Sequence, residues 1–442
     1  MTRARLDGVY LMLLGSLVFL LMGGAMENAN RTPLSDFKAL YYPARCLFQH
    51  GDPYKVSDVL RVYQADGENH PSDAADVRQI ATQNPYPPTA FTLSLFFAML
   101  PWGPAHLLWM MLTIGSFILA SFLIWNLGAD SAPTLYGALI GFLLANSELL
   151  LMTGNAAGIA ISLCAVAVWC FLRERLVPIG ILCLALGLAL KPHDTGLVWL
   201  YFLLAGGVYR KRALQTLLAM VALSLPAFLW VWHVAPSWMQ EMHSNILAFS
   251  AHGGMNDPVL ASAGGHSLDI LISLQTVISV FWDDPRFYNL VTYLICAPLL
   301  LLWAIVTLRS RPSAKRTWLA LAAIAALTML PVYHRQLDAK LLLLTIPACA
   351  MLWAEGGRIG RFAFLVNAAG LILTGDFSWA IFIAVTSALH LPATGLTGRM
   401  LMAVNVFSAP LILLVMGIFY LWVYARSSSG DSSLPPAAEP CS

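Results

Sequence analysis

Long apolar runs separated by short polar stretches fill most of the chain. A helix that crosses the hydrocarbon core of a bilayer needs about 20 predominantly apolar residues. Most of the runs approach that length, so the pattern predicts an all-α polytopic membrane protein with about 11–13 transmembrane helices. The runs lie at residues 8–25, 89–100, 104–127, 133–152, 156–172, 176–190, 195–209, 213–232, 287–308, 317–332, 339–354, 362–374, 377–391 and 401–425.

The amino-acid composition excludes an ordinary soluble domain. Hydrophobic residues make up 59% of the 442 residues, charged residues make up only 11%, and the mean hydropathy is +0.71. Soluble domains carry about 25% charged residues, so these side chains cannot form a water-soluble surface. The net charge of +2 is too small to predict a nucleic-acid partner. The seven cysteines include no CxxC pair, and we expect them to be unreactive core residues.

Basic residues gather at one set of helix ends, provided that the short run at 89–100, which ends at Pro101, enters the membrane without crossing it. The positive-inside rule then makes that side the cytoplasm. A full crossing would move most basic clusters outside, so we expect a re-entrant helix at 89–100. The acids expected on the cytoplasmic side are only Asp7, Asp130, Glu174 and Glu355. Of the 25 Lys and Arg residues, 14 fall there: Arg3, Arg5, Arg173, Arg175, 210–212, Arg309, Arg311, Lys315, Arg316, Arg358, Arg361 and Arg399.

Two polar stretches interrupt the bundle, at residues 26–87 and 233–286, and this topology makes both extracytoplasmic. The first holds eight of the 23 acidic residues and is rich in turn-forming residues, which predicts a surface loop with short helices. We expect one membrane domain over residues 1–425, with an uncleaved first helix, and a disordered tail over 426–442. Function is therefore expected on the outer face.

Asp36 is the first candidate for chemistry, because it follows the first helix by about ten residues and so lies near the membrane surface. Nearby hydrogen-bond donors and aromatic rings, which we expect to contact the substrate, are supplied by Tyr41, Tyr42 and Arg45. A single carboxylate carries no pattern of its own, so the alternative is one solvated acid among many in a loop.

Two further polar clusters lie between apolar runs on the same expected side. Lys191 and His193, with Asp194, are costly at membrane depth unless they face a polar cavity, although a helix-end lysine can also snorkel. In the second cluster, Asp338 follows His334 by one helical turn, so both can face one cavity if the turn is helical. An ion pair between Arg335 and Asp338 is the structural alternative.

Asn155 follows Gly154 between two outer helix ends, where it can orient a sugar hydroxyl or form a tight turn. The second loop contains several histidines and acids, yet no HExxH or comparable ligand pair occurs, and we expect no metal site. No Walker A, GxGxxG or GxSxG motif is present, so no cofactor is expected. The loop residues concerned are His233, Glu241, His243, His252, Asp257 and His266.

Several strings, in order, resemble one family. DFKALYYPARCLFQHGDPY, NPYPPTAFTLSLFFAMLPWGPAHLLW, LTGNAAGIAISLCAVAVW and GLALKPHDTGLVWLYFLLAGGVYRK cover most of residues 30–215, and LPVYHRQLDAKLLLLTIP adds a weaker match. Together they resemble the polyprenol-phosphate-mannose-dependent α-mannosyltransferase-like proteins of the GT-C superfamily, glycosyltransferase family 87. The family's usual Gln after Gly is missing at Gly154-Asn155, and we still expect Asn155 to contact the substrate.

The resemblance implies a GT-C-like bundle and an inverting hexosyltransferase in a membrane, here a bacterial plasma membrane. Its donor would be a polyprenyl-phosphate-linked sugar, with mannose expected. Its acceptor would be a lipid-linked or glycan hydroxyl, reached from the extracytoplasmic side in contact with membrane lipid. Asp36 would be the base, and Lys191 or Arg335 would bind the departing phosphate.

Two other classes of membrane protein compete with this interpretation. A transporter or flippase would place charges near the bilayer centre and often shows two related halves, whereas these charges lie at helix ends and no halves match. A polysaccharide polymerase or ligase would be expected to have its large loop late in the chain. Here the largest loop comes first, which favours sugar transfer.

Overall fold

The computed structural model describes residues 2–29, 34–66, 75–252, 254–258, 271–378, 380–381 and 396–429. His266, most of the apolar run at 377–391 and the tail from residue 430 lie outside these ranges. Within them the secondary structure is helical, which confirms the all-α prediction. The helices are α1 (Arg3–Ala29), α2 (Ser35–Phe48), α3 (Val56–Ala65), α4 (Ala75–Thr82), α5 (Pro88–Ala98), α6 (Trp102–Gly128), α7 (Pro133–Ala145), α8 (Leu149–Thr153), α9 (Ala157–Arg173), α10 (Val177–Leu190), α11 (Pro192–Ala205), α12 (Gly207–Val234), α13 (Trp238–Ser250), α14 (Leu274–Ser279), α15 (Pro285–Arg309), α16 (Ala314–Leu327), the 3₁₀ helix η2 (Gln336–Thr345), α17 (Ile346–Glu355), α18 (Gly357–Leu373) and α20 (Leu396–Ser429).

Seven stretches of the described chain are helical, long and apolar enough to cross a membrane. They correspond to α1, α6, α7 with α8, α12, α15, η2 with α17, and the part of α20 from Phe407. The shorter apolar helices α5, α9 and α10 lie among them. The chain is therefore a multi-pass integral membrane protein. At 1.5 Å per residue, α5 rises about 16 Å, well short of a hydrocarbon core of about 30 Å.

The first helix packs closely against α7 through glycines. A Cβ atom at Gly15 would lie 2.1 Å from the carbonyl oxygen of Gly141, and one at Gly137 would lie 2.3 Å from that of Gly8. Small residues let two helix backbones approach in this way, which brings many atoms into van der Waals contact where lipid supplies no hydrophobic driving force. This contact anchors α1, and with it the start of the loop that carries Asp36.

Gly15→Ala is expected to lower the free energy of unfolding by about 1–3 kcal/mol, the usual cost of overpacking, because the new methyl group meets the α7 backbone. Unfolding in detergent micelles measures the change. The matched control is Gly115→Ala in α6, where a Cβ meets nothing within 4 Å. Alanine forms helices better than glycine, so the control should be neutral or slightly stabilising. Equal stabilities for the two variants would contradict this packing.

Ion pairs join the helix ends that the sequence assigns to the cytoplasm. Arg5 pairs with Asp130. Nη2 of Arg212 lies 3.1 Å from Oε1 of Glu174, and Nζ of Lys315 lies 2.5 Å from Oε1 of Glu355. Each pair joins an acid and a base that the predicted topology groups on one side, so these helix ends lie together, and the assignment of that side to the cytoplasm stays a prediction.

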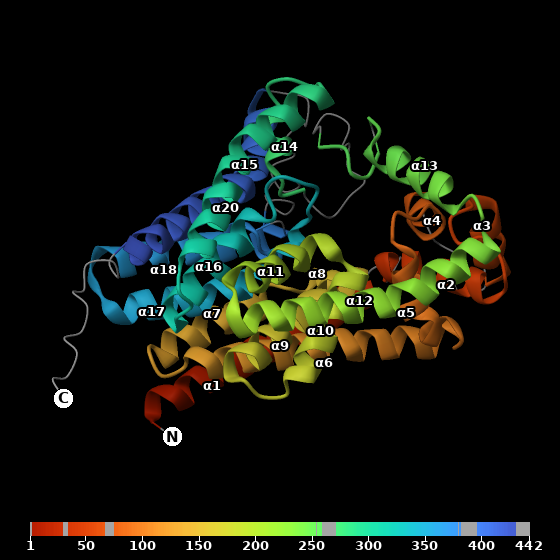
Figure 1. The fold of residues 1–442 in the computed structure, drawn as a ribbon. Helices are drawn as coiled ribbons and strands as arrows, with labels where there is room; N and C mark the ends of the chain where they lie inside the picture. The colour runs from red at the N-terminus through yellow and green to blue at the C-terminus, as the bar shows by residue number, and fades with distance from the viewer. Residues whose placement is uncertain are drawn as a thin grey trace.

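Helices α2, α3 and α4 of the first loop gather with α13 at one end of the molecule, away from the start of α1 (Figure 1). They are more than a surface loop, because α2 buries Leu40, Tyr41 and Tyr42 completely. These side chains share a second hydrophobic core with residues of α5, α6, α12 and α13, including Trp102 and Trp238. The first loop is thus a packed cap over one end of the bundle.

Two apolar runs are interrupted. The run at 133–152 divides at Asn146, whose carbonyl oxygen accepts a hydrogen bond from Nζ of Lys340 at 2.6 Å and whose Oδ1 accepts one from the backbone N–H of Phe377 at 2.7 Å. The run at 317–332 is helical only to Leu327, and residues 328–335 form a non-helical segment before η2. That segment turns toward the first loop and supplies part of the candidate site.

Candidate active site

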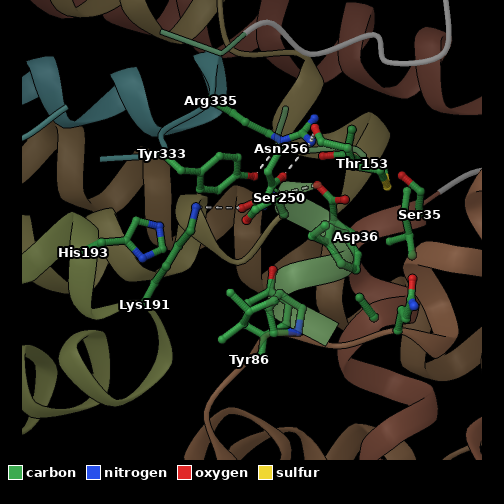
Figure 2. Close-up of a pocket in the computed structure, with 18 of the residues that line it drawn as sticks. Ser35, Asp36, Tyr86, Thr153, Lys191, His193, Ser250, Asn256, Tyr333 and Arg335 are labelled. Carbon is green, nitrogen blue, oxygen red and sulfur yellow. Dashed lines mark hydrogen bonds between the residues drawn. The ribbon is translucent and has the colours of Figure 1, made fainter. Parts of the chain in front are cut away.

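A cavity of about 420 Å³ opens between the first loop and the ends of several helices (Figure 2). Its wall comes from α2, α4, the turn at 83–87, the α8–α9 turn, the α10–α11 turn, α13, residues 255–256, Tyr333 and Arg335. The polar side chains on this wall come from positions far apart in the sequence. Six that matter for the chemistry are Asp36, Tyr86, Asn155, Lys191, Tyr333 and Arg335.

Asp36 lies in the first turn of α2 and is half-buried in the cavity wall. Leu34 precedes it in the left-handed conformation, with φ 51°, and donates its N–H to the carbonyl oxygen of Met152. This contact ties the start of α2 to the end of α8. An acidic side chain in the first turn of a helix is also favoured by the helix dipole.

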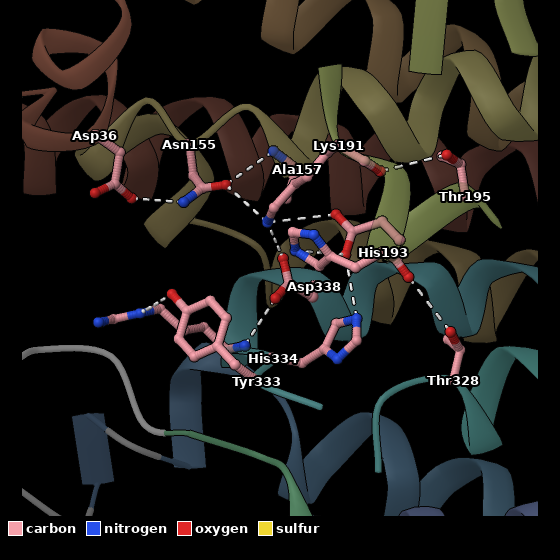
Figure 3. Close-up of polar contacts among 12 residues, drawn as sticks. Asp36, Asn155, Ala157, Lys191, His193, Thr195, Thr328, Tyr333, His334 and Asp338 are labelled. Carbon is pink, nitrogen blue, oxygen red and sulfur yellow. Dashed lines mark hydrogen bonds and ion pairs between the residues drawn. The ribbon is translucent and has the colours of Figure 1, made fainter. Parts of the chain in front are cut away.

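Asn155 connects Asp36 to Lys191 (Figure 3). Its Nδ2 donates to Oδ2 of Asp36 at 2.7 Å, and its Oδ1 accepts from Nζ of Lys191 at 3.3 Å and from the N–H of Ala157 at 2.8 Å. Gly154 makes this turn possible, because it adopts φ +65° and a Cβ there would lie 2.9 Å from Leu34. The structure thus shows the tight turn that the sequence offered for this residue, and the contact with a sugar hydroxyl stays a prediction.

Lys191 stands between α10 and α11 with its ammonium group almost fully buried. Its Nζ pairs with Oδ1 of Asp338 and lies 3.3 Å from Oδ2 of Asp194. A buried ammonium is stable only when it is paired and hydrogen-bonded in this way. The side chain also contributes to the cavity wall, so a positive charge faces the space beside Asp36.

Residues 333–338 bring a second cation to the cavity. Nε of Arg335 donates to the hydroxyl of Tyr333 at 2.6 Å, and Nη2 donates to the carbonyl oxygen of Met255 at 2.8 Å. Asp338 accepts the backbone N–H of Arg335 at 2.7 Å and forms its ion pair with Lys191. Arg335 is extended, with φ −107° and ψ 166°, so the helical spacing assumed for His334 and Asp338 does not apply.

His193 and His334 meet beside Asp194, with ring centroids 5.1 Å apart. His193 reaches the cavity, whereas His334 is fully buried behind it. Asp338 is likewise buried and does not line the cavity. The two clusters predicted from the sequence thus lie together. His334 and Asp338 are buried behind the cavity wall, whereas the sequence predicted that both could face the cavity.

Tyr41, Tyr42 and Arg45 lie outside this cavity. Arg45 donates to the hydroxyl of Tyr41, which itself donates to the carbonyl oxygen of Leu100 at 2.8 Å. The hydroxyl of Tyr42 lies 3.2 Å from Oδ2 of Asp66. These three side chains hold α2 against its neighbours, and their predicted substrate contacts remain a prediction.

The sequence did not single out Tyr86 or Asn256, which also line the cavity, whereas it placed Tyr333 beside His334 and Arg335 in a polar cluster. Burial, together with the nearby carboxylate of Asp36, raises the pKa of the Tyr86 hydroxyl. The hydroxyl therefore stays protonated and can donate a hydrogen bond to a ligand. The rigid NPYPP turn around Tyr86 was the signal available for it, since prolines fix the position of the residue between them.

The fold and the cavity define a polytopic membrane protein with an acid and two cations around one space. The sequence profile of glycosyltransferase family 87 matches residues 84–332, more than half of the chain. The chain therefore belongs to glycosyltransferase family 87 and is a membrane glycosyltransferase. The match includes Tyr86, Asn155 and Lys191, whereas Asp36 and Arg335 lie outside it. No curated protein and no solved structure matches the chain.

Proposed function

We propose that the protein moves a hexose, mannose in the first instance, from a polyprenyl-phosphate donor to an acceptor hydroxyl on the extracytoplasmic face, with inversion at the anomeric carbon. The observation that carries the proposal is the placement of Asp36, Lys191 and Arg335 around one cavity. Its volume of about 420 Å³ lies within the range of about 300–1,000 Å³ found for small-molecule sites.

Asp36 is the proposed base. Asn155 donates to its Oδ2, and Oδ1 has no hydrogen-bond partner among the described residues, so Oδ1 can accept a proton. As the acceptor hydroxyl attacks the anomeric carbon, its proton passes to Asp36. The bond between that carbon and the phosphate oxygen breaks, and its electron pair leaves with the phosphate. One displacement from the opposite side inverts the configuration.

Lys191 and Arg335 are the proposed phosphate partners. The polyprenyl phosphate is already a good leaving group, so no acid is needed to protonate it as it departs. Fixed positive charges in a partly buried cavity stabilise the charge that develops on its oxygens. This division of work needs one carboxylate, whereas a glycoside hydrolase needs two because its leaving group is poor.

Five separate segments meet at the cavity, and this supports a site on the extracytoplasmic face. The topology from basic residues expects residues 26–87, the turns at Gly154 and Lys191, the stretch 233–286 and the segment at 333–338 on the extracytoplasmic side. All five contribute to one cavity or to the cluster directly behind it. A lipid-linked donor also suits a membrane bundle, because its polyprenyl chain stays in hydrocarbon while the headgroup enters the cavity.

Purified protein in proteoliposomes tests the proposal, with polyprenyl-phosphate mannose and nucleotide-linked mannose offered as alternative donors. We expect transfer from the lipid-linked donor alone, with an α-linked product from a β-linked donor, as an inverting displacement requires. Transfer from the nucleotide sugar, or retention of configuration, would contradict it. Movement of an intact solute without transfer would favour the transporter or flippase.

A further inference from the structure

We infer that His193, His334 and Asp194 bind one divalent metal ion of the zinc class, immediately behind the cavity wall. The three residues come from the start of α11 and from the non-helical segment before η2. Together with Asp338 they form a group whose candidate ligand atoms all lie within 4.8 Å of one another. The sequence predicts no metal here, because His193 and Asp194 are adjacent while His334 lies far along the chain, and the three form no short ligand motif.

The distances fit ligands around an ion better than they fit hydrogen bonds. Nε2 of His334 lies 3.5 Å from Oδ1 of Asp194, and Nε2 of His193 lies 3.6 Å from the same oxygen. Hydrogen bonds between nitrogen and oxygen are about 2.7–3.2 Å long. Ligand bonds of about 2.1 Å in a tetrahedron place neighbouring ligand atoms about 3.4 Å apart. The observed distances of 3.5 and 3.6 Å are close to this distance between neighbouring ligand atoms.

The ligand atoms have no hydrogen-bond partner. Nε2 of His193, Nε2 of His334 and Oδ1 of Asp194 are all buried from solvent, and none forms a hydrogen bond among the described residues. His334 is 0% exposed and Asp194 is 1% exposed. Buried polar atoms are almost always satisfied, so three such atoms that point at one another indicate an absent partner between them.

His334 is held in the orientation of a metal ligand. Its Nδ1 lies 3.1 Å from the carbonyl oxygen of Val332, so Nδ1 carries the hydrogen and Nε2 presents a lone pair in the neutral ring. Metal-binding histidines commonly donate their other nitrogen to a backbone carbonyl in this manner, which fixes the tautomer. Here the same contact turns the Nε2 lone pair toward Asp194.

The local charges leave a position for a cation. Lys191 contributes one positive charge, and Asp194 and Asp338 contribute two negative charges in contact with it. Nζ of Lys191 lies 3.3 Å from Oδ2 of Asp194 in an ion pair, although that oxygen forms no hydrogen bond among the described residues. Lys191 also pairs with Oδ1 of Asp338, and the backbone N–H of Arg335 donates to Oδ2 of Asp338. Oδ1 of Asp194 is left to the two histidines, so an ion there does not displace Lys191.

Two imidazoles and one carboxylate suit zinc, which binds through nitrogen and oxygen in tetrahedral geometry. Three protein ligands leave the fourth position open. His193 is half-buried and also lines the cavity, which gives an ion a route to the site. The excess of one negative charge could instead be balanced by a proton. His334 would then be an imidazolium beside the carboxylate of Asp194.

Metal analysis of the full-length protein separates these two possibilities. Protein carrying an affinity tag without histidine is stripped with a chelator, equilibrated with zinc chloride and freed of excess ion, and zinc is counted by mass spectrometry. We expect one zinc per chain in the wild type. His334→Gln and Asp194→Asn should weaken binding by at least about 10²-fold, beyond the 10–100-fold loss caused by removing an outer partner.

The matched control is His252→Gln. Nδ1 of His252 lies 3.3 Å from Oδ2 of Asp257, a similar histidine–carboxylate contact, but its side chain is 67% exposed. The control should keep one zinc per chain. X-ray absorption on the wild type adds a test that needs no variant, with two imidazole nitrogens expected about 2.0–2.1 Å from zinc.

A wild type that binds no zinc would overturn the inference and leave imidazolium as the occupant. Zinc that persists in both His334→Gln and Asp194→Asn, or an absorption spectrum without imidazole ligands, would also overturn it. None of these measurements uses sugar transfer, so their failure and the failure of the proposed function are distinguishable.

Discussion

Asp36→Asn is expected to lower kcat/KM for sugar transfer by about 10²–10⁴-fold, the range for loss of a general base. Asparagine keeps the size of the side chain and can still bond to Asn155, but its amide cannot take the proton of the acceptor hydroxyl. The loss should therefore appear mainly in kcat, with donor binding little changed. Initial rates in proteoliposomes, with insertion confirmed by size-exclusion chromatography, measure both constants.

Asp58→Asn is the control for this result. Asp58 belongs to α3 of the same loop, pairs with Arg61 at 2.9 Å and lies outside the cavity around Asp36. Loss of its charge should leave kcat/KM for sugar transfer within about twofold of the wild-type value, because a partly exposed ion pair of this kind stabilises the protein by at most about 1 kcal/mol. Equal losses in the two variants, or an active Asp36→Asn protein, would remove Asp36 from the role of base.

Hydropathy predicted the long membrane helices closely, because the same bilayer thickness sets the length of each apolar run. The run at 104–127 became α6, Trp102–Gly128, and the run at 287–308 became α15, Pro285–Arg309. The run at 213–232 became the longer α12, Gly207–Val234, since its basic first turn remains helical beyond the hydrocarbon. Charge does not end a helix, whereas it does end an apolar run.

Breaks inside apolar runs could not be predicted in this way. The division of 133–152 at Asn146 depends on hydrogen bonds to Lys340 and Phe377, both far away in the sequence. The end of α16 at Leu327 has the same kind of cause, because the segment that follows it forms backbone hydrogen bonds with residues near Ile272. The N–H of Ile272, for example, donates to the carbonyl oxygen of His334 at 2.9 Å. Such partners are invisible in a local average of hydropathy.

Helical periodicity explains which first-loop residues reach the cavity. Once Ser35–Phe48 is helical, a residue three positions after Asp36 shares its face, and Ala39 does line the cavity. Tyr41, Tyr42 and Arg45 follow at five, six and nine positions and turn toward other neighbours. The sequence predicted short helices in this loop without giving their bounds, and the face of each residue could not be assigned without those bounds.

The meeting of Asp36 with Lys191 and Arg335 came from topology rather than from spacing. No short motif joins them. The assignment of their segments to one side of the membrane, together with the family resemblance, predicted that they could share a site. The pairing of Lys191 with both Asp194 and Asp338 was beyond that reasoning. Side-chain partners at this depth depend on how the helix ends pack, as the non-helical backbone at Arg335 illustrates.

Lys191→Met is expected to lower the free energy of unfolding by about 3–5 kcal/mol, because Asp194 and Asp338 lose the ammonium group that compensates their buried charge. Methionine has a similar length, so little cavity forms. Denaturant unfolding in micelles measures the loss. Lys315→Met is the matched control. It breaks a pair with Glu355 whose side chains are 43% and 47% exposed, and it should change stability by no more than about 1 kcal/mol.

The double variant Lys191→Met/Asp338→Asn separates the structural effect of the lysine from its proposed contact with phosphate. Removing one of the two acids reduces the uncompensated charge, so stability should return in part. Sugar transfer should stay low, because the cavity still lacks the cation that stabilises the leaving phosphate. Transfer that recovers together with stability would show that Lys191 acts only by holding Asp194 and Asp338 in place, and would leave Arg335 as the phosphate partner.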